Sequence, residues 1–169
     1  AVARFFMLID IKKLLTGREE HAAGEFEADL SGESFPAGFS LKAPVRIAYD
    51  ARRQGDGARL ELDILCQAVI QCDRCLEQVE RTYHYTPDYL LFEGDWTGED
   101  PELPFTSAGK LDLKELGYDE ILLNLPSSLL CRPDCQGLCP VCGKPVSAGC
   151  SCRQNVGDDR LSILKQLLS

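Results

Sequence analysis

Residues 60–75, Leu-Glu-Leu-Asp-Ile-Leu-Cys-Gln-Ala-Val-Ile-Gln-Cys-Asp-Arg-Cys, alternate between apolar and polar side chains and end in two cysteines. One parity carries Leu60, Leu62, Ile64, Cys66, Ala68, Ile70 and Cys72, and the other carries Arg59, Glu61, Asp63, Gln67 and Gln71. A period of two is typical of a β-strand with one buried and one solvated face. The stretch therefore predicts a long strand that buries Cys66 as a small core side chain.

The flanking segments extend this strand into an antiparallel sheet. Alternation resumes in residues 79–89, which places the two cysteines at the tip of a hairpin. Residues 26–30 and 39–50 alternate in the same way, and Pro44 within the second run suits an edge position. Residues 50–57 end in Gly-Asp-Gly, which predicts a turn before the long strand.

One helix is predicted after the sheet. Asp112 is a candidate N-cap, and Glu115 follows three residues later, as in a capping box. The apolar face of this helix comprises Leu113, Leu116, Ile121, Leu122 and Leu125. Pro126 ends the pattern, and the apolar face is expected to pack on the sheet.

The chain has nine cysteines, and eight of them form four close pairs. The pairs are Cys72 with Cys75, Cys131 with Cys135, Cys139 with Cys142, and Cys150 with Cys152. Such short spacings suit two thiolates that bind one metal ion better than they suit a relaxed disulfide. Two zinc ions are therefore expected, because zinc favours tetrahedral sites of four thiolates, while four cysteines also suit an iron–sulfur cluster.

The spacing favours one grouping of the four pairs. The two pairs within residues 139–152 can close around one ion without outside help, with glycines nearby to let the backbone turn. Cys131 and Cys135 then need a distant pair, which leaves Cys72 and Cys75. Spacing also permits a cross-braced arrangement in which the pairs are exchanged between the two sites.

The cysteines also suggest how the chain is divided. Six of them lie within residues 131–152 and leave little room for a hydrophobic core, so a metal must order this segment. A final amphipathic helix is expected from about residue 158, with Leu161, Leu164 and Leu168 at helical spacing. We therefore expect a β-rich body with one helix over residues 1–130 and a zinc-binding ribbon with a C-terminal helix over residues 131–169. The predicted fold class is α+β, with an antiparallel β-sheet or partly open barrel, a packed helix and a C-terminal cysteine-rich zinc ribbon.

The net charge of −9 is unevenly distributed. Residues 1–130 hold 13 basic and 24 acidic side chains, whereas residues 131–169 hold five basic and three acidic ones. A chain this acidic is not expected to bind nucleic acid without regard to sequence, because such binding depends on clustered Lys and Arg side chains that contact phosphates. Any contact with phosphates should be local. The candidates are the tail cations Arg132, Lys144, Arg153, Arg160 and Lys165.

A second candidate contact lies in the body. Residues 93–104 hold five acidic side chains in their first ten positions and the chain's only tryptophan, Trp96. The composition predicts a solvated loop. An aromatic side chain framed by acids could also bind a basic segment of a partner protein.

The cysteine tail makes the chain recognisable. Residues 131–152, with Asp-Cys-Gln-Gly-Leu-Cys-Pro-Val-Cys-Gly at their centre, resemble the bacterial family of large ribosomal RNA subunit accumulation proteins, the YceD-like proteins. The hairpin motif at residues 72–75 and the helix segment at residues 120–126 are similar to that family too. The resemblance implies a cytoplasmic, non-catalytic factor in large-subunit ribosomal RNA accumulation and assembly. The expected partner is a precursor of the large ribosomal subunit, bound through rRNA, a basic ribosomal protein or both.

Other functional classes fit the sequence less well. The four-thiolate sites would be closed, whereas a hydrolytic zinc keeps an open position, and neither His21 nor His84 lies near the cysteine tail in sequence. A zinc–thiol redox switch and a zinc-ribbon adaptor for other proteins remain alternatives. The first residues are apolar only briefly before Asp10, which predicts no leader and no membrane span and favours the cytoplasm. We expect no enzyme activity and no small-molecule substrate.

Overall fold

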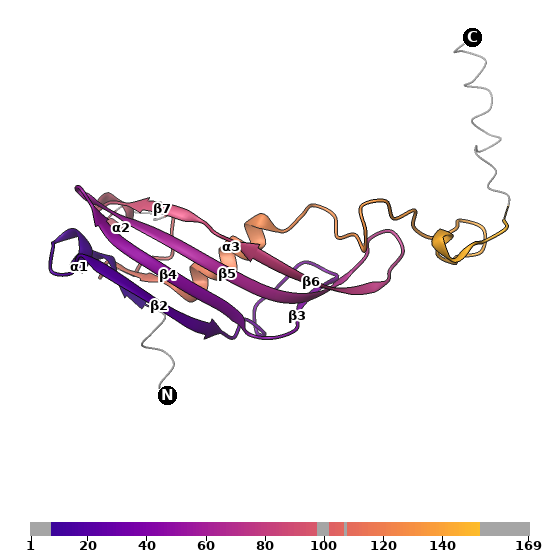
Figure 1. The fold of residues 1–169 in the computed structure, drawn as a ribbon, viewed down its shortest axis with the longest axis horizontal. Coiled ribbons are helices and arrows are strands. Elements are labelled where there is room, and N and C mark those ends of the chain that lie inside the picture. The colour runs from indigo at the N-terminus through magenta and orange to yellow at the C-terminus, as the bar shows by residue number, and fades with distance from the viewer. Residues whose placement is uncertain (1–7, 98–101, 107, 153–169) are drawn as a thin grey trace, which may run out of the picture.

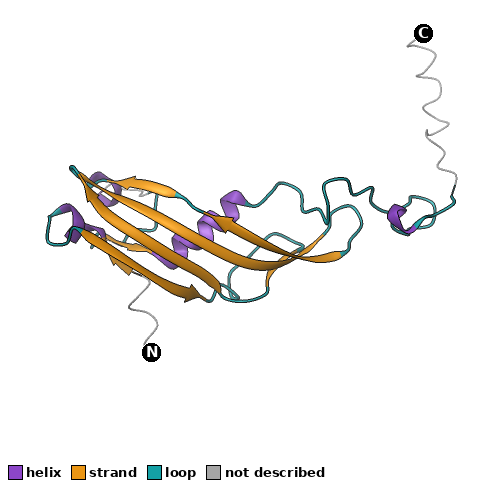
Figure 2. Ribbon diagram, in the orientation of Figure 1, coloured by secondary structure: helices purple, strands orange, loops and turns teal. Residues whose placement is uncertain are grey.

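The computed structural model describes residues 8–97, 102–106 and 108–152. Its main feature is a six-stranded antiparallel sheet (Figures 1 and 2). The strands are β2 (His21–Ala28), β3 (Phe39–Leu41), β4 (Val45–Gln54), β5 (Gly57–Gln71), β6 (Gln78–Tyr85) and β7 (Asp88–Leu91). The central strand β5 pairs with β4 and β3 along one edge and with β7 and β6 along the other. Within the described residues the sheet is open, because β2 pairs only with β4.

The remaining elements flank this sheet. They are β1 (Leu8–Asp10), α1 (Ile11–Leu15), α2 (Gly94–Thr97), β8 (Lys110–Asp112), α3 (Leu113–Asn124) and the short 3-10 helix η2 (Val146–Ala148). β1 and β8 form a separate two-stranded antiparallel sheet. α3 lies across one face of the large sheet, and the segment after it continues toward the β5–β6 hairpin (Figure 2).

The alternation in β5 is confirmed by burial. Side chains of the apolar parity are all buried, from Leu60 through Ile70, and those of the other parity are exposed or half-buried. Cys66 lies in the main hydrophobic cluster, and burial raises the pKa of its thiol to about 11. Cys66 is therefore a neutral core side chain, as predicted.

The predicted helix is also confirmed, and its contacts explain where it begins and how closely it packs on the sheet. The carboxylate of Asp112 accepts hydrogen bonds from the backbone N–H groups of Lys114 and Glu115 at 2.9 and 3.2 Å. In the middle of α3, Gly117 lies against the buried side chain of Ile47 on β4. A Cβ atom at residue 117 would come within 2.5 Å of Cδ1 of Ile47. The absence of a side chain thus lets α3 approach the sheet closely, and the fold is α+β.

Five boundaries differ from the expected ones. The strand expected over residues 26–30 is β2, which begins at His21 and ends at Ala28, and the run of residues 79–89 is divided between β6 and β7. The run of residues 39–50 is two strands, and Pro44 precedes β4, an inner strand, so its expected edge position is wrong. The expected turn of residues 50–57 shrinks to Gly55 and Asp56, because buried alanines continue the strand pattern on both sides. The segment from residue 93 is not wholly a loop, since it forms the one-turn helix α2.

The sequence patterns did not predict β1, α1 and β8. Each is three to five residues long, which is too short to show a period. The predicted C-terminal helix lies outside the described residues. None of the helices in the described part of the chain has the length and apolar composition of a membrane-spanning helix.

Candidate metal centres

The first cysteine quartet joins the hairpin tip to the segment after α3. Cys72 and Cys75 lie in the loop between β5 and β6, and Cys131 and Cys135 approach them from the tail. The sulfur atoms of Cys72 and Cys135 are 3.7 Å apart, and those of Cys75 and Cys131 are 3.6 Å apart. The four sulfurs all lie within 4.8 Å of one another, so they could hold one metal ion.

Backbone amides turn toward the sulfurs of this quartet. Burial opposes ionisation of Cys72, but N–H groups of Cys131, Cys75 and Arg74 point at its sulfur and lower its pKa to about 6. For Cys131, burial and the neighbouring thiols raise the pKa to about 12. One thiolate is thus stabilised by the backbone. Ionising all four sulfurs together would require a cation among them.

The two residues between Cys72 and Cys75 hold the tail in place. The backbone N–H of Asp73 donates to the carbonyl of Leu129 at 2.8 Å, and the Asp73 carboxylate accepts from the Leu129 N–H at 2.7 Å. The Arg74 guanidinium donates to the carbonyl of Cys135 at 2.8 Å. No local sequence pattern indicates a role for Asp73 or Arg74, because their partners lie more than 50 residues away along the chain.

The second quartet is local. Cys139, Cys142, Cys150 and Cys152 bring their sulfurs within 4.8 Å of one another over 14 residues. The N–H of Gly143 donates to the carbonyl of Cys139 at 2.8 Å, which closes the turn around this cysteine pair. The backbone N–H groups of Cys142 and Val141 lower the pKa of Cys139 to about 7. This quartet is more open than the first, because Cys142 is exposed.

The structure adopts the self-contained grouping and not the cross-braced one. The sulfur distances of the first quartet suit a metal ion better than a disulfide. A disulfide has its sulfurs about 2.0 Å apart, far closer than the pairs observed here. Four sulfurs placed tetrahedrally at about 2.3 Å from one zinc ion are about 3.8 Å apart, close to the 3.6 and 3.7 Å of the first quartet.

The candidate contact residues do not form one surface. Arg132 lies beside the first quartet and pairs with Asp134 at 3.7 Å, while Lys144 is exposed beside the second quartet. Arg153, Arg160 and Lys165 lie outside the described residues, as does the side chain of Trp96. The backbone of Trp96 belongs to α2, which lies at the end of the sheet opposite the cysteine tail (Figure 1). The two candidate contacts are therefore far apart.

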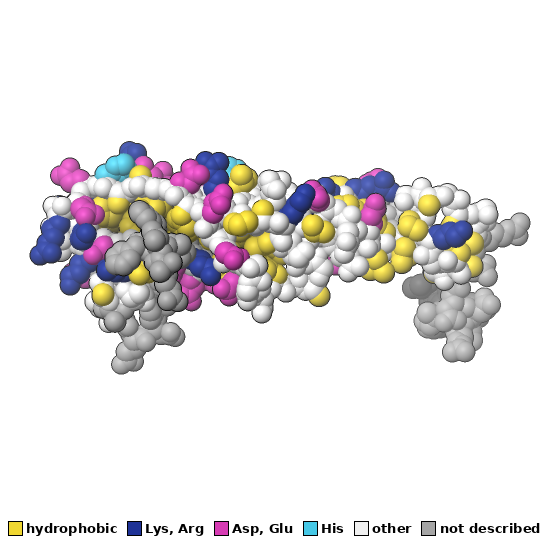
Figure 3. Space-filling view, turned by 90° about the horizontal axis from the view of Figure 1, so that it is seen from below, with side chains coloured by type: hydrophobic (Ala, Val, Ile, Leu, Met, Phe, Trp, Pro, Cys, Tyr) yellow, Lys and Arg dark blue, Asp and Glu magenta, His cyan; other side chains and the backbone are white. Residues whose placement is uncertain are grey.

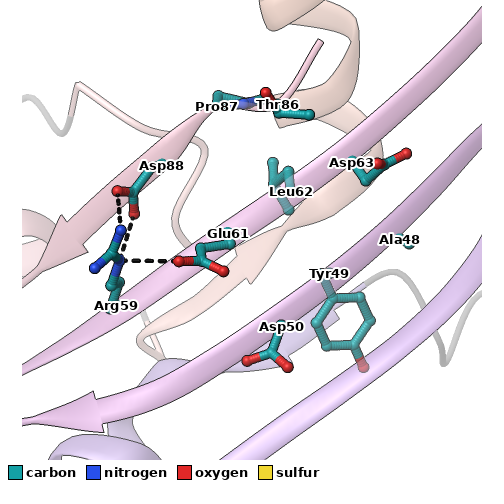
Figure 4. A pocket seen from close by; sticks show the side chains of 10 residues that line it. All are labelled: Ala48, Tyr49, Asp50, Arg59, Glu61, Leu62, Asp63, Thr86, Pro87 and Asp88. Carbon is teal, nitrogen blue, oxygen red and sulfur yellow. Dashed lines mark hydrogen bonds and ion pairs between the residues drawn. The ribbon is translucent and has the colours of Figure 1, made fainter. Parts of the chain in front are cut away.

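The solvated face of the sheet carries a shallow hollow of about 500 Å³ beside the gap between β6 and β7 (Figure 4). Each of its four carboxylates already lies against a basic side chain. Asp50 contacts Arg52 and His21, Asp63 contacts His84, and both Glu61 and Asp88 contact Arg59. The hydrogen bonds from Arg52 and His21 lower the pKa of Asp50 to about 2. The hollow is thus lined by carboxylates that already belong to surface ion pairs.

Comparison with known proteins identifies the family. Residues 60–168 match the family described as large ribosomal RNA subunit accumulation protein YceD. Uncharacterized proteins of Mycobacterium bovis and Mycobacterium tuberculosis are each 27% identical over 175 residues, covering 89% of this chain and 84% of the relative. No solved structure matches the chain. Because the family match spans more than half of the chain and includes both cysteine quartets, the chain belongs to the large ribosomal RNA subunit accumulation protein YceD family.

Proposed function

We propose that this chain is a non-catalytic assembly factor that binds a precursor of the large ribosomal subunit and supports accumulation of its rRNA. The observation that carries the proposal is the family match over residues 60–168, the region that contains both quartets. The family's description names the large ribosomal RNA subunit. The acidic charge of the chain favours a local contact with rRNA, with a basic ribosomal protein, or with both.

Within this proposal, each quartet binds one structural zinc ion. Support comes from the sulfur spacing, which is 3.6 and 3.7 Å in the first quartet and within 4.8 Å in both, and which suits a single tetrahedral ion. An iron–sulfur cluster spreads its cysteines over several irons and separates their sulfurs further. The first ion would fix the tail to the β5–β6 hairpin, and the second would order residues 139–152, in which Cys139 alone is buried. Elemental analysis of the purified, reduced protein should find about two zinc ions per chain. One ion, or iron with sulfide, would contradict this assignment.

The binding partner is tested directly in cells. Crosslinking in a bacterium that expresses the chain, followed by separation of ribosomal particles, should recover it with immature large subunits. Mature ribosomes and small-subunit precursors from the same gradient serve as controls. Recovery only in complexes without ribosomal components would overturn the proposed function.

A zinc–thiol redox switch is the second candidate, and the exposure of Cys142 favours it. A thiolate that oxidants can reach is oxidised more readily than a buried one. Mild peroxide should then release zinc from the second quartet first and change the binding of ribosomal precursors. Slow release with unchanged binding would leave the static scaffold as the function.

A further inference from the structure

Leu76 combines two unfavourable features. Of the residues other than glycine that the structure describes, Leu76 alone has a positive φ, at 62°. In this left-handed region a leucine Cβ crowds its own backbone, and bulky side chains are found there only rarely. The side chain is also 55% exposed, so burial does not offset the backbone strain.

Comparison with the second cysteine turn shows that the left-handed conformation belongs to the turn and that the leucine side chain makes it strained. Leu76 follows Cys75 as Gly143 follows Cys142. In each turn the N–H of that residue donates to the carbonyl of the first cysteine at 2.8 Å, and φ is 62° at Leu76 and 70° at Gly143. The turn therefore requires the left-handed conformation, which glycine adopts without strain. A leucine in its place needs another explanation, and local strain is characteristic of functional positions.

We propose that the Leu76 side chain is an apolar anchor that inserts into a socket on a protein partner. The proposal rests on the proposed function and names the kind of contact that the precursor provides. A leucine side chain offers no charge, no hydrogen bond and no aromatic ring, which are the groups that recognise RNA. An exposed apolar side chain on a rigid turn instead suits a desolvated pocket at the centre of a protein interface.

The surrounding charges indicate a basic partner. The loop of residues 72–77 that carries Leu76 holds two acidic side chains, Asp73 and Glu77, and one basic side chain, Arg74. A divalent ion held by the four thiolates of the first quartet would add a net charge of −2 beside this loop. Figure 3 shows that Lys and Arg side chains as well as Asp and Glu side chains are spread over this face of the molecule, without one large basic patch. We infer an apolar socket within a positively charged protein surface.

The test is the pair of variants Leu76→Gly and Leu76→Asn, because both residues tolerate a positive φ and neither fills an apolar socket. Both variants should keep the metal content of the parent chain, and the urea midpoint of Leu76→Gly should be unchanged or higher. Binding to purified immature large subunits should weaken about tenfold in both, the loss expected for a central apolar contact. Leu123→Ala is the matched control, since Leu123 is 78% exposed on α3 with ordinary helical backbone and should bind like the parent.

The outcomes separate this anchor from the proposed function. If the parent chain binds immature subunits and both Leu76 variants bind equally well, the anchor is wrong and the assembly role stands. If the parent chain does not bind the particles, both proposals are wrong. Protein-free large-subunit rRNA is the second probe, and an equal loss of affinity for it in both variants would show that Leu76 contacts RNA and not a protein. A lower urea midpoint for Leu76→Gly would show that Leu76 serves folding instead.

Discussion

Two charged residues between the first pair of cysteines illustrate how single side chains organise this molecule. Asp73 binds the backbone of Leu129 through both its own amide and its carboxylate, and Arg74 binds the carbonyl of Cys135. Gly137 passes so close to this turn that a Cβ atom there would lie 3.0 Å from the carbonyl oxygen of Arg74. The metal ligands are thus surrounded by contacts that would position the tail before an ion binds.

Asp73→Ala should weaken this junction. The substitution removes the acceptor of the Leu129 N–H, a hydrogen bond to a charged group, and should lower the free energy of unfolding by about 1 kcal/mol at this exposed position. Urea denaturation measures the loss, and limited proteolysis should cut faster between residues 126 and 131. Asp73→Asn keeps an acceptor oxygen and should lose less, so equal losses in the two variants would contradict the role of this hydrogen bond.

At the scale of elements, the contact between α3 and β4 sets the separation of helix and sheet. Gly117 lies on the buried side of α3, directly over Ile47, which is fully buried. Glycine weakens a helix by roughly 1 kcal/mol relative to alanine, so its presence in the second turn requires a packing reason. The close approach to Ile47 supplies that reason.

Gly117→Ala should therefore destabilise the protein despite its better helix propensity. The new methyl group would clash with Cδ1 of Ile47, and overpacking of this kind costs about 1–3 kcal/mol. Ile47→Val removes that Cδ1 atom, so the double variant should recover much of the loss in a double-mutant cycle measured by thermal unfolding. Gly32→Ala is a suitable control, because the structure places nothing within 4 Å of a Cβ atom there. Additive losses in the cycle would exclude the proposed clash.

At the scale of the whole molecule, the two quartets have different structural consequences. The first joins segments more than 50 residues apart in sequence, whereas the second closes within 14 residues. The described tail beyond Cys135 extends away from the sheet (Figure 1). The loss of each ion should therefore affect a different part of the chain.

Cysteine-to-serine pairs test this difference. Replacing Cys139 and Cys142 with serine should remove one zinc equivalent and expose the tail to protease, while the urea midpoint of the sheet stays unchanged. Replacing Cys72 and Cys75 should remove the other equivalent and release the tail from the hairpin, with a lower midpoint because both sulfurs are buried. Equal loss of global stability in the two variants would refute the independence of the second quartet.

Charge reversal tests which end of the molecule binds the precursor. Changing Arg132, Lys144 and Arg153 together to glutamate should weaken binding to immature large subunits and flatten its dependence on salt, because fewer phosphate counterions are released. Filter binding over a series of salt concentrations measures both effects. Trp96→Ala is the comparison at the opposite end of the sheet. Unchanged binding in the triple variant, with loss in Trp96→Ala, would move the contact to the acidic segment and favour a basic protein partner.

The sequence alone determined the alternation of β5, the burial of Cys66, the cap of α3 at Asp112 and the family. These features depend on local periods, on short-range hydrogen bonds or on motifs of close spacing, all of which can be read along the chain. The short elements and the break at Pro44 were missed, because three to five residues carry no period and the pairing of β3 and β4 along one edge of β5 is a long-range contact.

Only the tertiary structure decided how the cysteines group and what surrounds them. Spacing permitted both the self-contained and the cross-braced arrangement, and the path of the chain after α3 selected the first by bringing Cys131 and Cys135 to the hairpin tip. The same path gave Asp73 and Arg74 their partners, and the geometry of the turn placed Leu76 in a left-handed conformation with its side chain in solvent. Contacts between residues far apart in sequence leave no local pattern, so they appear only when the chain is folded.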